Sequence, residues 1–591
     1  MTETSASTAA YPESGACLYS CIVVFTLSLL ACLLSFSIYP SLEMYDNGII
    51  VSGADAVLQG KFPYRDFWTM YAPGQFYLTA LLFRMFEPQL YLACLIGIVS
   101  KAIIVTSGYA ALKRYIGKKW LPELGAVVLA LFLVRMGNET FPTFPAAALA
   151  MQALLLMERG LAQRRLYQLF AAGLFTALAA CFRHDMGFYT AVALSFGAAF
   201  ISKMQPQPAS WREIMRMLGA YWGGILLIGV PVAAFFLYHV PFQDFYENLI
   251  HIPSAIYPEV RRLPWVGVKQ LQDTFTAMQT SKHPMYVLMM GVREFVVYVP
   301  FLVAIPALYH SAHQLWQGKK NGEAANAAQP FVLLASLLCL LMTLKGAVRP
   351  APHHLAQSIV LAIPVGLLMA PALLKTGAAE AAEKFILAAC LSLACIPLAA
   401  TDFIGYDRVM GGLYKLGAEN NVIDRCKNPA LPRLRCMMAY YQSDRRNVMV
   451  ADFLRQRTPP DAPIYIGAGR HDKIFWNSVM MYFMAERPAA TKWAELHPGV
   501  QTRAETQMHM IEEMRRTPPG FLVLDTDWDT VHENNLSSKS SGIHFLDNWL
   551  RECYKEVARF ESIHLMTPHP DAGERCRAPA QASKTVPPDT P

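Results

Sequence analysis

The chain has 591 residues, of which 54% are hydrophobic and only 16% are charged, whereas soluble domains carry about 25% charged residues. This composition excludes a disordered or collagen-like chain and an ordinary cytosolic enzyme. The net charge of +7 does not indicate a nucleic-acid partner, because the basic residues lie mainly in short loops between apolar runs, where positive charge reports membrane topology.

The apolar runs predict a membrane protein. Crossing a bilayer takes about 20 apolar residues, and nine runs approach this length: 18–38, 89–112, 166–182, 186–202, 217–239, 293–310, 330–348, 355–374 and 384–404. Two shorter runs, 121–134 and 141–157, are expected to pair as a hairpin. The predicted fold is therefore mainly α-helical, a polytopic bundle of about 11 spans.

The charges of the loops predict the orientation of this bundle. Lys and Arg gather in alternate loops: 113–119, 159–165, 203–216, 319–320 and 375–384. Cytoplasmic loops collect such residues, so residues 1–17 are expected to be a cytoplasmic segment, followed by a transmembrane domain over 18–404. The first outer loop, 39–88, then faces outward, as it would from a bacterial inner membrane.

The composition changes after Thr401. Residues 405–566 are expected to form a soluble extracytoplasmic α/β domain, with strands at 464–466 and 521–524 and a surface helix over 501–516. The tail, 567–591, is rich in Pro, Ala, Ser and Thr and is predicted to be disordered.

Four cysteines lie in the outward domain. An oxidising compartment would allow Cys426–Cys436 and Cys553–Cys576 bridges, although four cysteines permit three pairings. No cysteine spacing is typical of a zinc site, and neither a metal nor another cofactor is predicted. The segment Gly467-Ala468-Gly469-Arg470-His471-Asp472 lacks the third glycine of a dinucleotide fingerprint.

Candidate acidic residues lie in the first outer loop, which contains Tyr45-Asp46-Asn47-Gly48 and, further on, Tyr64-Arg65-Asp66. A carboxylate at Asp46 would suit a general base at the rim of a cavity, or equally the N-cap of a short interfacial helix. Asp66 is a secondary acidic candidate, for which a structural ion pair with Arg65 is the alternative.

Two further polar groups interrupt apolar sequence on the same predicted side. Arg183-His184-Asp185 could be a phosphate clamp, since the Arg fork matches phosphate oxygens, or a self-contained Arg–Asp pair closing a hairpin. The second group contains Lys345, Arg349, His353 and His354. Arg261 and Arg262 could assist it, or equally bind lipid headgroups. Two cationic clusters indicate an anionic ligand outside the membrane. The Glu495-Leu496-His497-Pro498-Gly499 turn is either structural or part of an acceptor surface.

The first outer loop resembles that of the polytopic GT-C glycosyltransferases, especially bacterial relatives of the protein O-mannosyltransferases and the lipid A aminoarabinose transferases. The resemblance rests on the early Asp46, followed by Gly60, Pro63-Tyr64-Arg65-Asp66-Phe67 and Pro73-Gly74. It implies a polyprenyl-phosphate sugar donor and Asp46 as catalytic base. Asn47 stands where the family commonly has a second acid. Tyr45, Asn47, Tyr64 and Arg65 are candidate acceptor or loop residues.

These observations predict an inverting glycosyltransferase that moves a sugar from a polyprenyl-phosphate donor to a hydroxyl or amine of a lipid, glycan or protein acceptor. Arg183, His184, Lys345, Arg349, His353 and His354 are the predicted donor-phosphate residues. Two alternatives stay open. One is a transporter or flippase of a lipid-linked glycan, although no repeated halves are visible; the other is a non-catalytic glycan-assembly factor, which Asn47 would suit.

Overall fold

The structure of the chain is a computed structural model. It describes residues 14–38, 42–116, 120–137, 139–373, 381–417, 426–427, 429–437, 442–571 and 576. The first thirteen residues of the predicted cytoplasmic segment and nearly all of the predicted disordered tail therefore lie outside the described residues.

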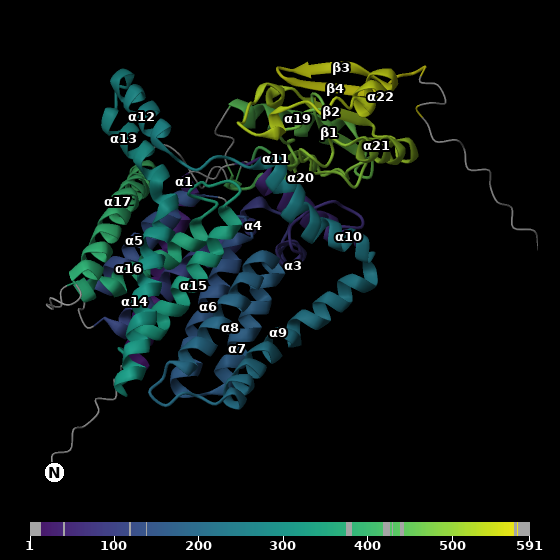
Figure 1. Cartoon of the computed structure of the whole chain (residues 1–591). Helices are drawn as coiled ribbons and strands as arrows, with labels where there is room; N and C mark the ends of the chain where they lie inside the picture. Colours follow the sequence, from purple (N-terminus) through teal and green to yellow (C-terminus); the bar gives the residue numbers. More distant parts are fainter. Residues whose placement is uncertain are drawn as a thin grey trace, which may run out of the picture.

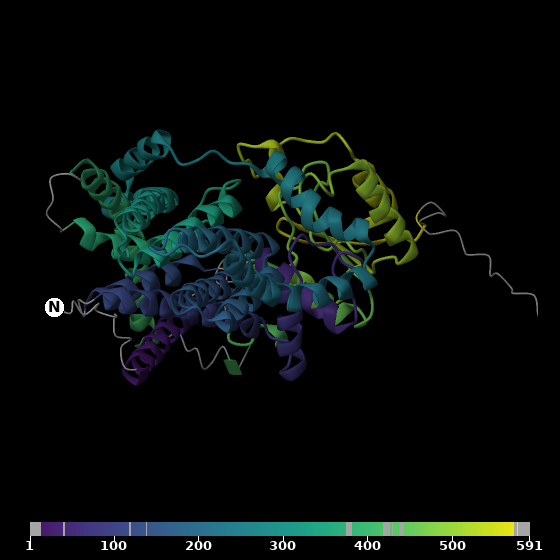
Figure 2. The ribbon, with the colours of Figure 1, turned by 60° about the horizontal axis from the view of Figure 1, so that its bottom comes forward.

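The protein is mainly helical, with a long helical bundle beneath a smaller domain that contains a sheet (Figure 1). The bundle helices are α1 (Ser14–Ile38), α4 (Leu90–Tyr115), α5 (Trp120–Met136), α6 (Thr143–Gln163), α7 (Leu166–Phe182), α8 (His184–Lys203), α9 (Trp211–His239), α14 (Val299–Asn321), α15 (Gln329–Gly346), α16 (Ala356–Leu373) and α17 (Ala381–Gly417). Helix α1 lies at the edge of the bundle (Figure 2), and little of it is buried.

Within the described residues, seven helical segments are long and apolar enough to cross a membrane, and α7 and α16 are shorter apolar helices beside them. The chain is a membrane protein. Helices α5 and α6 cover the predicted hairpin but fall outside the set of seven, so the count of about 11 spans stays a prediction. Helix α17 continues thirteen residues past 404, where the membrane domain was expected to end.

Close helix packing depends on small residues, as is common in membranes. A Cβ atom added to Gly173 of α7 would lie 1.9 Å from the Tyr221 carbonyl of α9, and one added to Gly224 would lie 2.1 Å from the Phe170 carbonyl. The two backbones can touch because neither position carries a side chain.

The basic turns between α6 and α7 and between α8 and α9 lie at the bundle end away from the smaller domain (Figure 1). Arg114, Arg164, Arg216 and Ala325, from four loops or helix ends, line one cavity there of about 650 Å³. Three of the basic segments predicted to be cytoplasmic, at Arg114, Arg164 and Arg216, therefore lie together with the segment around Ala325.

The C-terminal domain contains a four-stranded sheet in the order β1-β2-β4-β3. Strand β1 (Ile464–Ala468) runs parallel to β2 (Phe521–Asp525), and β2 pairs antiparallel with β4 (Ile563–Pro568), which pairs antiparallel with β3 (Tyr554–Phe560). Its helices are α19 (Gln442–Arg457), α20 (Met480–Ala485), α21 (Ala504–Arg516) and α22 (Phe545–Cys553). The Cys426–Cys436 and Cys553–Cys576 bridges are both present.

The first outer loop joins the two parts through α2 (Asp46–Leu58) and α3 (Gly74–Met85). Helix α2 contacts α20: a Cβ atom on Gly48 would lie 2.3 Å from the Met480 nitrogen, which donates a 2.9 Å hydrogen bond to the Met44 carbonyl. The Ser52 hydroxyl donates to the Val479 carbonyl at 3.2 Å. The C-terminal domain is thus docked on the segment that carries Asp46.

The loop between α9 and α14 also reaches the C-terminal domain. It contains α10 (Phe242–Tyr246), the π-helix η1 (Glu247–Ile256), α11 (Tyr257–Arg261), α12 (Val268–Thr280), α13 (Pro284–Arg293) and the 3-10 turn η2 (Glu294–Tyr298). Helix α11 ends at Arg261, which is 5% exposed. The buried side chain of Arg261 therefore lies between the helical bundle and the C-terminal domain.

Candidate functional site

Asp46 is the first residue of α2, after Tyr45 at the N-cap position. No side chain caps this helix end, so Asp46 does not serve as the N-cap that was one alternative. Among the residues that the structure describes, the Asp46 carboxylate makes neither a hydrogen bond nor an ion pair. It is therefore available to a ligand.

The electrostatics of Asp46 connect it to three cations. Burial raises the pKa of its carboxyl to about 6, while the positive charges of Lys345, Arg261 and Arg349 act in the opposite direction and favour the carboxylate. These cations come from the end of α15, the end of α11 and the loop after α15. Segments far apart in the sequence thus bring one carboxylate and three positive charges into one site.

Arg183 lies at the same site, but its guanidinium group is already paired with a carboxylate. Its Nε and Nη2 atoms donate to the two carboxylate oxygens of Asp185 at 3.0 and 2.6 Å, which is the self-contained pair that the sequence left as an alternative. The guanidinium carbon also lies 6.0 Å from the centre of the Tyr71 ring and 5.9 Å from that of Phe141. His184 is half-buried at the start of α8.

Lys345 shares this aromatic wall, with its Nζ atom 5.1 Å from the centre of the Phe141 ring. It also donates to the His354 carbonyl at 3.4 Å. Burial and the nearby cations lower the pKa of His353 to about 4 and that of His354 well below its usual value. Both imidazoles are neutral at neutral pH, so the permanent positive charge of this cluster comes from Arg349, and Lys345 adds a second charge when its amine is protonated.

The C-terminal domain contributes an acidic side chain to these cations. Glu533 accepts hydrogen bonds from Arg349 Nη1 and Nη2 at 2.8 and 2.5 Å and from Arg261 Nη1 at 3.2 Å. The Arg261 guanidinium also lies over the Phe475 ring, 5.0 Å from its centre. Two of the three cations that act on Asp46 are therefore held by one carboxylate of the C-terminal domain.

The same domain contacts the residue that precedes Asp46. The Tyr45 hydroxyl donates to Glu495 Oε1 at 3.2 Å and lies 3.3 Å from the Leu496 carbonyl oxygen. The Tyr45 ring stacks on Trp476, with centroids 5.5 Å apart. Tyr45, named from the sequence as a loop candidate, is thus a contact between the two parts of the chain.

The remaining first-loop candidates lie in structural contacts. Arg65 and Asp66 form a surface ion pair of 2.8 Å, and this pairing lowers the pKa of Asp66. The Tyr64 hydroxyl donates to the Tyr71 carbonyl at 2.8 Å. Asn47 is buried, and its Oδ1 accepts a 2.6 Å hydrogen bond from Thr140. The loop thus divides into a segment at the site and a segment that supports it.

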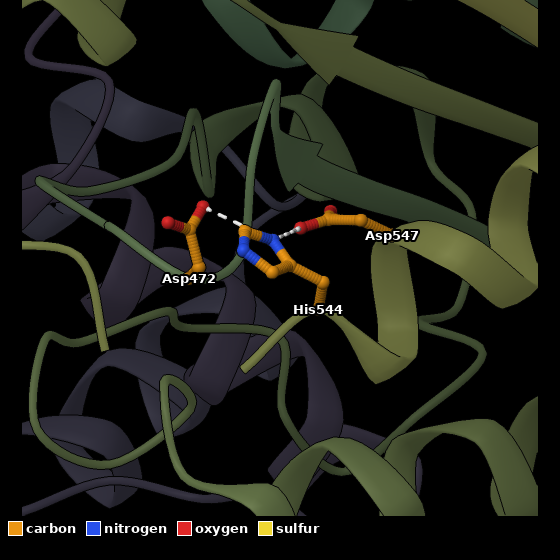
Figure 3. Close-up of side chains that lie close together, drawn as sticks. All are labelled: Asp472, His544 and Asp547. Carbon is orange, nitrogen blue, oxygen red and sulfur yellow. Dashed lines mark ion pairs between the residues drawn. The ribbon is translucent and has the colours of Figure 1, made fainter. Parts of the chain in front are cut away.

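A separate group of Asp472, His544 and Asp547 lies in the C-terminal domain (Figure 3). His544 Nδ1 is 3.8 Å from a carboxylate oxygen of each aspartate. Both carboxylates already accept hydrogen bonds from protein groups, Asp472 from Arg470 and Ser540 and Asp547 from His471. A cation there would compete with these donors, so we assign the group no function.

Glu533, Tyr71 and Tyr257 were missed as site residues, whereas Glu495 lies in the turn that the sequence left as either structural or part of an acceptor surface. Tyr71 lies beside Arg183, whose guanidinium carbon is 6.0 Å from the centre of its ring, and the charges of Asp46 and Arg183 both act on the hydroxyls of Tyr71 and Tyr257. The sequences around Glu533, Tyr71 and Tyr257 contain no motif that indicates a functional site. A contact between residues far apart in the sequence leaves no recognisable pattern in the sequence around either residue.

Comparison with known proteins gives a match at the level of structure only. No family model and no curated protein matches the sequence. The crystal structure of ArnT from Cupriavidus metallidurans in the apo state is 13% identical, with a TM-score of 0.50, and the match covers 96% of this chain and 100% of that chain. The chain has the GT-C fold.

Two further structures match with lower scores. ArnT from Cupriavidus metallidurans bound to undecaprenyl phosphate is 14% identical, with a TM-score of 0.49 and coverage of 93% of this chain and 98% of that chain. The Archaeoglobus fulgidus oligosaccharyltransferase in the apo form is 12% identical, with a TM-score of 0.46 and coverage of 86% and 70%.

Proposed function

We propose that the protein is a membrane glycosyltransferase that moves a sugar from a polyprenyl-phosphate donor to a hydroxyl or amine acceptor, with inversion at the anomeric carbon. The observation that carries the proposal is the carboxylate of Asp46, which has no hydrogen bond or ion pair among the described residues and lies within electrostatic reach of Lys345, Arg261 and Arg349. A base and an anion-binding group are the two parts that such a transfer needs.

On the donor side, the bond that breaks joins the sugar to a phosphate. This phosphate is already a good leaving group, so positive charge that stabilises its developing negative charge is sufficient. Lys345 and Arg349 are the proposed phosphate ligands, with Arg261 beside them. Arg183 and Arg349 are each paired with a carboxylate, Asp185 and Glu533. We assign Arg349 to the phosphate because its charge acts on Asp46, and Arg183 to the wall of the site because it packs against the Tyr71 and Phe141 rings.

On the acceptor side, Asp46 removes the proton from the attacking hydroxyl or amine as the new glycosidic bond forms. The burial that raises its pKa to about 6 brings this carboxyl closer to neutral pH, which suits a general base. A single displacement opposite the leaving phosphate inverts the anomeric carbon.

Two further observations support the donor class and the side of the membrane. ArnT, the protein of the matching fold, has been crystallised with undecaprenyl phosphate. The site lies under the C-terminal domain, at the bundle end away from the basic loops, so the positive-inside rule favours the extracytoplasmic face of a bacterial inner membrane.

Release of polyprenyl phosphate tests the proposal. Purified protein in detergent is incubated with polyprenyl-phosphate sugars and candidate acceptors. We expect release by the wild type, loss of about 100-fold or more in Asp46→Asn, and near wild-type release in the matched control Asp66→Asn. Full turnover by Asp46→Asn would remove the proposed base, and movement of an intact glycan lipid across vesicles without bond cleavage would favour a transporter.

A further inference from the structure

The cavity lined by Arg114, Arg164 and Arg216 lies at the bundle end away from the C-terminal domain (Figure 1). Its volume is about 650 Å³, within the range of about 300–1,000 Å³ that is typical of pockets for small organic ligands. Four parts of the chain form its walls: the ends of α4 and α6, the turn from α6 to α7, the segment from the end of α8 into α9, and the segment from α14 to α15. The cavity is therefore built at a junction of helix ends.

The charged side chains of this cavity leave two arginines available. Three arginines and two glutamates line it: Arg114, Arg164, Arg216, Glu158 and Glu213. Arg114 Nη1 donates to the buried Glu158 carboxylate at 2.6 Å, and Glu213 Oε2 accepts from the nitrogen and hydroxyl of Ser210 in the cap of α9. Among the residues that the structure describes, the side chains of Arg164 and Arg216 make neither a hydrogen bond nor an ion pair. Two guanidinium groups can thus bind an anion.

The same cavity has an apolar wall. Large apolar side chains line it beside the charged ones: Leu161, Leu166, Ile201, Met204, Met217 and Leu315. A ligand there therefore meets positive charge and apolar surface together. A phosphate ester that carries a hydrocarbon chain matches both, whereas a small inorganic anion leaves the apolar wall uncovered.

Aromatic and basic residues surround the cavity. Three exposed aromatic residues lie within two positions of lining residues in the sequence: Tyr167, Trp211 and Trp316. Each has a basic side chain over its ring, namely Arg165, Lys203 and Lys320, at 5.9, 4.3 and 5.6 Å from the respective ring centres. Trp and Tyr are enriched where a membrane protein meets the lipid headgroups. These residues therefore place the cavity at the level of the headgroups.

We propose that this cavity binds one anionic phospholipid from the membrane leaflet at this end of the bundle. Arg164 and Arg216 hold its phosphate, because the guanidinium fork matches phosphate oxygens, and an acyl chain begins along the apolar wall. Basic pockets between transmembrane helices bind anionic headgroups by the same chemistry. The lipid joins the α6–α7 turn to α9 and so stabilises the packing of this end. This site is separate from that of sugar transfer and independent of the proposed function.

Two substitutions remove the charges and keep the fold. Arg164 ends α6 in the left-handed conformation, with a φ of 53°. Glycine adopts this conformation without strain, so Arg164→Gly removes the guanidinium and leaves a favoured backbone. Arg216 is exposed within α9, where glutamine is a good helix former, so Arg216→Gln is tolerated. The matched control is Arg212→Gln, which changes an exposed arginine one turn earlier on α9, outside the cavity.

Thermal unfolding of the purified protein in detergent measures the binding. Phosphatidylglycerol, an anionic phospholipid, should raise the unfolding temperature of the wild type and of Arg212→Gln by several degrees, because a ligand of the folded state stabilises it. Zwitterionic phosphatidylcholine should raise it less, and inorganic phosphate should have little effect. The double variant Arg164→Gly/Arg216→Gln should lose the shift. An equal shift in the double variant or with phosphatidylcholine would overturn the site, and an equal shift with inorganic phosphate would overturn a lipid as its occupant.

Cross-linking of the wild type tests the position of the lipid without any substitution. Phosphatidylglycerol with a photoreactive group on one acyl chain, near the glycerol, is added to the protein and illuminated, and mass spectrometry locates the labelled peptides. Labelling should concentrate at Met204, Met217 and Leu315 and should fall when unlabelled phosphatidylglycerol is in excess. Leu226 and Leu227, which are exposed on α9 away from the cavity, are the reference for ordinary lipid contact. Labelling of the cavity wall that is no greater than at this reference, or that the excess lipid leaves unchanged, would overturn the proposal.

Discussion

Arg349 and Glu533 form a two-bond ion pair between the helical bundle and the C-terminal domain, at 2.8 and 2.5 Å. Arg261 adds a third bond to the same carboxylate at 3.2 Å. The side chains of Arg349 and Glu533 are only 15% and 14% exposed, so water screens the pair weakly. A donor phosphate that binds these arginines must compete with Glu533.

Removing this competition should strengthen donor binding. In Glu533→Gln we expect the donor KM to fall several-fold, because Arg349 and Arg261 are no longer held by a carboxylate. The variant should also unfold at a lower temperature without donor, since two cations lose their partner. Titration of polyprenyl phosphate in a thermal-unfolding assay checks both effects, and should raise the unfolding temperature more in the variant than in the wild type.

The control for that prediction is Glu561→Gln, which removes an exposed carboxylate 3.5 Å from Arg446 in the C-terminal domain. We expect it to change neither the donor KM nor the donor-induced thermal shift. An unchanged donor KM in Glu533→Gln would mean that Glu533 only joins the two parts of the chain.

The activity should depend on pH through Asp46. Its carboxyl has a pKa raised to about 6 by burial, and only the ionised form can accept a proton. The rate of sugar transfer is therefore expected to rise as the pH increases through about 6. Initial rates between pH 5 and pH 7 measure this limb; a rate already constant at pH 5 would contradict the raised pKa.

The ionised carboxylate of Asp46 should also lower the free energy of unfolding. Because its folded-state pKa lies above the unfolded value, its contribution is fully present at low pH and is lost as the pH rises through about 6. We expect Asp46→Asn to unfold at a higher temperature than the wild type at pH 8 and at nearly the same temperature at pH 4. Equal unfolding temperatures at pH 8 would show that the site solvates the carboxylate well.

Arg183 can be tested together with its partner. Arg183→Ala leaves the Asp185 carboxylate without a cation, and we expect a loss of about 3 kcal/mol, the lower end of the range for a buried pair because Asp185 is still 20% exposed. The double variant Arg183→Ala/Asp185→Asn should recover most of the stability and, if Arg183 only forms the wall of the site, most of the activity. If the double variant is as stable as the wild type but still binds the donor weakly, Arg183 contacts the donor phosphate directly.

The two disulfides offer a test of topology. The predicted orientation places Cys426, Cys436, Cys553 and Cys576 in an oxidising compartment, where bridges persist. In membranes prepared under alkylating conditions, these four cysteines should react with a thiol reagent only after reduction. Replacing Cys553 and Cys576 by Ser should cost about 3 kcal/mol in the chain-entropy model. Free thiols without reduction would place the domain on the reducing side.

Part of the site could be predicted because a local pattern marks it. Asp46 follows closely on a span, and Arg183, Lys345 and Arg349 interrupt or end apolar runs, where ionisable side chains are costly. The same pattern includes Arg65 and Asp66, which the structure pairs at the surface, since a charge beside an apolar run does not say which way it points. The orientation of the Asn47 side chain also depends on a distant residue, because its Oδ1 accepts a hydrogen bond from Thr140, 93 positions away.

By itself, the sequence determined the helical membrane class and the strands of the C-terminal domain, because these follow from hydrophobic length and period. Only the tertiary structure decided that Glu533 holds Arg349 and that Glu495 lies against Tyr45. Those contacts join residues 184 and 450 positions apart, and their free energy comes from burial and charge pairing across the docked domain, for which no short stretch of chain carries a signal.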